Sequence, residues 1–106
     1  MNEKLNLTNE TLVAAQHPDY KAEIAQILRS TLTPKPMKER VLAYHENDIA
    51  AAMELLSREE RSRLYNILEA KTLANILEYS GRLDEYIREL TIRKQVDVLS
   101  QLEAAT

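Results

Sequence analysis

Apolar residues in the first 44 positions recur at the three- and four-residue spacing of amphipathic helices. Three short helices are predicted, over about residues 8–17, 19–30 and 34–42, with Thr8 capping the first. The first ends before Pro18, because a residue that precedes proline is pushed out of the α region. The third begins with Thr33 as N-cap and Pro34 at the first helical position, where its missing N–H costs nothing. The residues expected to face inward are Leu12 and Ala15, then Ile24, Ile27 and Leu28, then Met37, Val41 and Leu42.

From residue 45 onward the apolar stripes become more regular and recur about every 10–12 residues. Ser57 and Glu60 have the spacing of a capping box, in which each side chain accepts from the other's backbone N–H. Gly81, the only glycine, follows a helix predicted over about residues 70–80 and suits the left-handed residue that ends many helices. The last helix is expected to turn Val96, Leu99 and Leu102 inward. The residues predicted to form the core are Leu56, Leu64, Ile67, Leu68, Ile76, Leu77, Ile87 and Leu99.

Helices of roughly 8–12 residues are not stable alone, so each must pack on its neighbours. The pattern therefore predicts an all-α fold, built as an array of short stacked helices. Residues 1–106 form one domain in this interpretation, with 1–44 as an N-terminal helical cap and 45–106 as the main array. A single glycine and three prolines also disfavour a fold rich in β-hairpins.

The run His45-Glu46-Asn47-Asp48 has two interpretations, a metal or acid–base site and the start of a helix. Acidic residues suit a first helical turn because they face unpaired N–H groups and the positive end of the helix dipole. His45 or Glu46 can cap, and Asp48 is assigned to the same structural role. The chain has no cysteine, and its other histidine is His17, so the structural interpretation is favoured and an enzyme is not expected.

The distribution of charge narrows the classes of partner. The net charge is −3, which gives no indication of nucleic-acid binding. Residues 1–44 hold six Lys/Arg and five Asp/Glu, whereas residues 45–106 hold eight and twelve, so the second part has the acidic excess. Such a surface suits cations or a basic partner, and is more often simply solvated. No stretch has the length of a membrane span and the start lacks the apolar core of a signal peptide, so a soluble, cytoplasmic chain is expected.

Four blocks of residues in the second part resemble the N-terminal cytoplasmic domain of MgtE-type magnesium transporters. The family phrase is roughly H-P-x-D-L-A, L-x-x-E-x-R, L-L and A-x-x-L, in that order, and the resemblance covers about residues 41–102. Glu46 stands where the family has proline. The blocks in this chain are His45-x-x-Asp48-Ile49-Ala50, Leu55-Leu56-Ser57-x-Glu59-Glu60-Arg61, Leu64-x-x-Ile67-Leu68 and Ala74-x-Ile76-Leu77-Glu78.

The resemblance implies a right-handed superhelix of short helices that regulates a magnesium transporter. In the family this domain precedes a pair of CBS domains and a membrane-embedded pore, and the full-length protein is expected to be a homodimer at the cytoplasmic face of the membrane. Mg²⁺ bound between the acidic surfaces of the two cytoplasmic parts holds the pore closed.

The resemblance also implies where the ion would bind. The family's metal-binding glutamate aligns with Asn75, which carries no charge. Glu78, with Asp84 or Glu85 across the turn at Gly81, is therefore the proposed half-site for weakly bound Mg²⁺, and a solvated surface is the competing interpretation of Glu78.

A second functional class remains open, a helical protein-interaction module with no ion role. The middle domain of the flagellar switch protein FliG is built of similar short helices and belongs to this class, although no glycine-bearing surface motif occurs here. Continuation of the gene into CBS domains and transmembrane segments would favour the transporter hypothesis.

Overall fold

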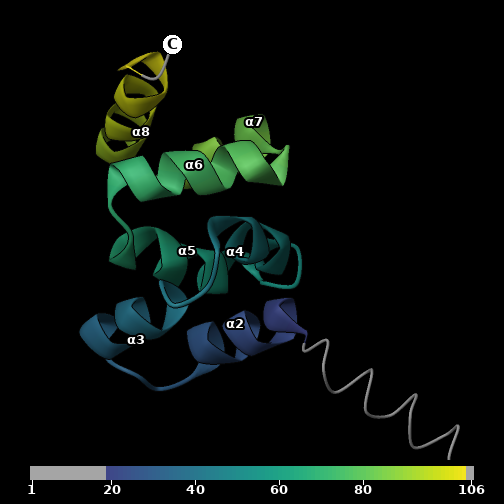
Figure 1. The fold of residues 1–106 in the computed structure, drawn as a ribbon. Coiled ribbons are helices and arrows are strands. Elements are labelled where there is room, and N and C mark those ends of the chain that lie inside the picture. Colours follow the sequence, from purple (N-terminus) through teal and green to yellow (C-terminus); the bar gives the residue numbers. More distant parts are fainter. Residues whose placement is uncertain (1–18, 105–106) are drawn as a thin grey trace, which may run out of the picture.

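A computed structural model describes residues 19–104, and every regular element in that range is helical. The all-α prediction is therefore confirmed (Figure 1). The helix predicted over 8–17 lies outside the described residues. The elements are α2 (Tyr20–Arg29), α3 (Pro34–Val41), α4 (Glu46–Met53), α5 (Arg58–Ile67), α6 (Ala70–Ser80), α7 (Leu83–Tyr86), the 3₁₀ helix η1 (Ile87–Glu89) and α8 (Ile92–Ala104).

The helices are stacked along one direction, as Figure 1 shows. The layer formed by α2 and α3 lies at one end, α4 and α5 follow, α6 and α7 come next, and α8 stands at the far end. The longest of the described helices, α8, has 13 residues. Helices this short depend on their neighbours for stability. The stacking is what brings residues of α4 and α6 to one surface.

Local sequence signals account for most helix ends. Ser57 caps α5 and forms the predicted capping box with Glu60. The Ser57 hydroxyl accepts from the Glu60 N–H at 3.2 Å, and the Glu60 carboxylate accepts from the Ser57 N–H at 2.8 Å. Gly81 ends α6 in the left-handed region, as predicted, with φ 70°. Pro34 occupies the first position of α3, and its N-cap Thr33 makes no side-chain capping hydrogen bond.

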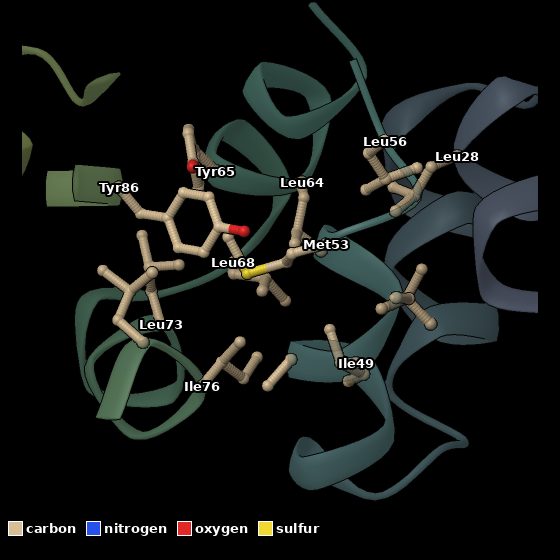
Figure 2. Packing of buried hydrophobic residues seen from close by; sticks show 14 of the residues in the cluster. Leu28, Ile49, Met53, Leu56, Leu64, Tyr65, Leu68, Leu73, Ile76 and Tyr86 are labelled. Atoms are coloured by element: carbon tan, nitrogen blue, oxygen red, sulfur yellow. The ribbon is translucent and has the colours of Figure 1, made fainter. Parts of the chain in front are cut away.

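A single apolar cluster runs through the stack, and Figure 2 shows how α2, α4, α5, α6 and α7 contribute to it. Of the predicted core residues, Leu56, Leu64, Leu68, Ile76 and Leu77 are buried. Ile67 and Ile87 are partly buried against the cluster. The other buried members are Ile24, Ala25, Leu28, Met37, Val41, Ile49, Ala50, Ala52, Met53, Tyr65, Leu73, Ala74, Tyr86, Leu90 and Val98.

Three apolar residues predicted to face inward are exposed instead, so those predictions were wrong. Leu42 is 43% exposed, and it is the C-cap of α3, which ends at Val41. Leu99 and Val96 are 46% and 56% exposed. The α8 helix packs through Val98, which is fully buried, and through the partly buried Leu102.

A charged cluster joins α5 to η1. The Arg61 guanidinium donates from Nε and Nη2 to the two carboxylate oxygens of Glu89 at 2.8 Å and 2.6 Å. It also donates to the Leu56 carbonyl at 2.7 Å. The guanidinium carbon lies 5.3 Å from the centre of the Tyr86 ring, within the range of a cation–π contact. The Tyr65 hydroxyl donates to Glu89 at 2.6 Å, and burial together with this hydrogen bond raises the pKa of Tyr65. These contacts hold the short α7–η1 segment against the array.

Basic side chains also bind backbone carbonyls near the ends of helices in other layers. Arg29 donates to the Leu55 carbonyl at 2.6 Å, just after α4 ends. Arg63 reaches the Leu28 carbonyl in the last turn of α2 at 2.9 Å, and Lys94 reaches the Leu68 carbonyl at the end of α5 at 2.7 Å. The carbonyls near a helix C-terminus lack partners within the helix and form its negative end, so these contacts favour stacking.

Candidate functional site

An open hollow between α4 and α6 is lined by polar and acidic residues. It has a volume of about 450 Å³ and is lined by Glu46, Asn75, Glu78 and Tyr79. Glu46 is the first residue of α4, and the other three lie on the C-terminal half of α6. Asn75 and Glu78 are three residues apart and therefore share one face of that helix. The hollow thus places two carboxylates beside one neutral amide.

The amide of Asn75 binds the carboxylate of Glu46. Its Nδ2 donates to Glu46 Oε2 at 3.3 Å, and this contact joins α6 to α4. An acidic residue at position 75 would instead place a second negative charge beside Glu46, which is unfavourable without a cation. Asn75 therefore has a structural role at this surface, as the donor that joins α6 to α4.

His45 has a structural role beside the hollow. It is the N-cap of α4, and its Nδ1 accepts from the Asn47 N–H at 3.0 Å. Its ring lies edge-on to Tyr79, with centroids 5.8 Å apart. His45 therefore supplies the cap, and Asp48, which was assigned that role from the sequence, is the third residue of α4 and an acidic member of its first turn.

The three residues predicted to form the half-site are not placed together around this hollow. Glu78 lines it, but Asp84 and Glu85 lie in the first turn of α7, beyond the Gly81 turn, and do not line it. Within residues 19–104, no group of three or more His, Cys, Asp or Glu side chains is arranged to hold a metal ion. The arrangement offers two carboxylates on an open surface.

Glu46 is the member of this site that sequence reasoning assigned only to a helix N-terminus. Its partner Asn75 lies 29 positions later in the chain, and no local spacing links the two residues. The sequence nevertheless contained one relevant signal. The capping pattern places Glu46 in the first turn of a helix, so its carboxylate was expected at that helix end.

No protein family, curated protein or solved structure gives a match to this chain. Between residues 19 and 104, no helix is both long enough and apolar enough to cross a membrane.

Proposed function

We propose that this chain is a cytoplasmic regulatory domain of a magnesium transporter, which senses Mg²⁺ by docking through its α4–α6 face onto a following pair of CBS domains. The observation that carries the proposal is the hollow in which Glu46 and Glu78 present two carboxylates from stacked helices. The sequence blocks that resemble the MgtE N-terminal domain include the same stretches, 45–50 and 74–78.

The chemistry of Mg²⁺ explains why two carboxylates suit a sensor. Mg²⁺ requires near-octahedral oxygen ligands, gives up water reluctantly and is usually held by one or two carboxylates. An ion between Glu46, Glu78 and acidic groups of a partner would hold the two surfaces together. Removal of the ion leaves like charges opposed, and the surfaces separate. This movement is the proposed signal to the pore.

In this proposal, Asn75 lowers the affinity of the isolated chain for Mg²⁺. Because its amide is neutral, the face carries less negative charge than three carboxylates would, and binding of the cation to the isolated chain is weak. We expect a dissociation constant in the millimolar range, which corresponds to about −4 kcal/mol. The acidic groups of the partner are then required for tighter binding.

The test is a titration of the chain with MgCl₂, followed by NMR chemical shifts and by calorimetry. Millimolar binding is expected, with the largest shifts at residues 46 and 75–79. Glu46→Gln and Glu78→Gln should each weaken it, whereas Asp84→Asn and Glu85→Gln serve as matched controls and should leave it unchanged. Weakening by the α7 substitutions alone would move the site to the Gly81 turn, and micromolar affinity would contradict a half-site.

A variant that should gain Mg²⁺ affinity provides a second test of the hollow. Asn75→Asp places a third carboxylate in the hollow and removes the donor to Glu46. It should lower stability without Mg²⁺ and increase Mg²⁺ affinity by roughly tenfold or more, since ligand charge governs affinity in such sites. Unchanged affinity would show that the hollow does not bind the ion.

The second candidate function is a helical protein-interaction module without an ion role. The exposed apolar residues of α8 favour it. If no Mg²⁺ binding is measured, even with a CBS pair attached, the interaction module is the favoured function.

A further inference from the structure

The last helix has an apolar stripe that the array leaves exposed. Ile92, Val96 and Leu99 are 80%, 56% and 46% exposed, while the opposite side of α8 is anchored by the buried Val98. From the helical repeat of about 100° per residue, the three exposed residues lie within about 60° of one another around the helix. Their spacing of four and then three residues is that of a coiled-coil seam. The α8 helix stands at the far end of the stack in Figure 1.

The stripe is self-complementary about its middle residue. If two α8 helices pack antiparallel with Val96 of one against Val96 of the other, Ile92 of each lies opposite Leu99 of the other. Such a pairing is isologous and closes as a two-fold dimer. Antiparallel packing also sets the two helix dipoles in the favourable relative direction.

Charge on one flank of the stripe favours the same arrangement. Arg93 and Asp97 are four residues apart and therefore lie on one flank of α8. In an antiparallel pair centred on Val96, Arg93 of one copy lies about 3 Å along the axis from Asp97 of the other, from the helical rise per residue. A parallel pair would instead turn this flank toward the opposite one, where Gln95 lies. Two symmetric ion pairs thus distinguish the antiparallel arrangement.

We infer that α8 is a homotypic docking surface, through which two copies of this chain associate by an antiparallel pairing of Ile92, Val96 and Leu99. A seam of three apolar layers is smaller than a standard protein interface, so the dimer is transient, with a dissociation constant on the order of 0.1 mM. These three residues are separate from the α4–α6 hollow, and their pairing does not depend on Mg²⁺.

Sedimentation equilibrium of the whole chain, from tenfold below to tenfold above that concentration, tests the association. The weight-average mass should rise toward twice the monomer mass. Val96→Glu should keep the chain monomeric, whereas Leu55→Glu should behave like the unchanged chain. Leu55 is a matched control because it is 45% exposed and lies outside α8. A monomer throughout the range, or equal loss with Leu55→Glu, overturns the inference.

Charge exchange tests the pairing without altering the apolar stripe. Arg93→Asp should weaken association by roughly tenfold, and the combination of Arg93→Asp with Asp97→Arg should restore it, because the ion pairs re-form with reversed sign. A circular dichroism spectrum identical to that of the unchanged chain shows that the fold is retained. Failure of the double variant to recover would contradict the assigned pairs.

The chain has no cysteine, so single introduced cysteines can report the relative orientation of the two α8 helices by disulfide cross-linking. Val96→Cys should form a disulfide with its own copy under mild oxidation. An equal mixture of Ile92→Cys and Leu99→Cys chains should form the mixed disulfide in preference to either homodimer. Preferential self-linking of Ile92→Cys would indicate a parallel pair and would refute the arrangement.

Discussion

Replacement of Glu89 by glutamine tests whether the charged cluster holds η1 against α5. The Glu89 carboxylate accepts three short hydrogen bonds, two from Arg61 and one from Tyr65. The side chains of Arg61 and Glu89 are only 17% and 14% exposed, so water replaces little of what is lost. Glutamine has nearly the same shape but removes the negative charge that pairs with the Arg61 guanidinium.

The expected loss follows from this environment. Breaking a fully buried ion pair costs about 3–5 kcal/mol, because an uncompensated charge remains. In this variant the new amide oxygen can still accept one hydrogen bond, and Arg61 keeps the Leu56 carbonyl and the Tyr86 ring. Glu89→Gln should therefore lower the free energy of unfolding by about 2–3 kcal/mol. That is a large part of the stability of a domain of this size.

The dependence on pH provides an internal check. The hydrogen bond from Arg61 is the main cause that holds the pKa of Glu89 below its ordinary value of 4.5, while burial opposes the shift. Because the pKa is lowered in the folded state, the carboxylate stabilises the fold above pH 4.5 and loses that contribution as the pH falls through the folded pKa. The difference between the unchanged chain and Glu89→Gln should therefore be constant near neutral pH and shrink in acid.

Urea unfolding followed by circular dichroism measures both effects. The matched control is Glu69→Gln, since Glu69 pairs with Lys38 at 3.6 Å but is 77% exposed. The loss of that exposed pair should cost less than about 0.5 kcal/mol. A double-mutant cycle with Arg61→Met should show a coupling of more than about 1 kcal/mol. Equal costs for the two glutamine variants, or strictly additive effects in the cycle, would refute the proposed clamp.

Substitutions at four further positions test the core and the helix ends by the same unfolding measurement. Leu68→Ala should cost about 2–5 kcal/mol because Leu68 is buried, and Leu99→Ala, on the exposed stripe, should cost much less; similar costs would contradict the assigned faces. Gly81→Ala should cost about 1–2 kcal/mol through its positive φ. An added Cβ there would have no atom within 4 Å, so a neutral effect would exclude a left-handed cap. Ser57→Ala should cost about 1 kcal/mol and Ser57→Gly less, and a neutral effect of Ser57→Ala would mean that the capping hydrogen bond contributes little.

Features that depend on residues three or four positions apart could be predicted from the sequence. The capping box of Ser57 and Glu60, the left-handed Gly81 and the helix start at Pro34 each depend on backbone geometry within a few residues. Inward positions such as Ile76 and Leu77 were also recognisable, because the α-helix has a fixed period. The all-α class follows from these local signals together.

The polar contacts of the clamp and of the candidate site join distant positions and could not be found in this way. Arg61 and Glu89 are 28 residues apart, and Glu46 and Asn75 are 29 apart. Each pair meets only because intervening helices stack in a particular order. The spacing of charged residues within one helix contains no information about that order. Glu78 was proposed with Asp84 and Glu85, its neighbours in the sequence, and the structure shows in addition that Glu78 lines one hollow with Glu46.

In α8, the local sequence pattern determines the helix, whereas the tertiary structure determines which side of it is buried. Its sequence determines that residues 92–104 form an amphipathic helix, but it contains two apolar stripes, Ile92-Val96-Leu99 and Val98-Leu102. Both stripes have helical spacing, so the pattern alone does not select the buried one. The selection depends on how α8 packs against α6, the helix on which it lies in the tertiary structure. Val98 therefore meets the core, and the richer stripe remains exposed.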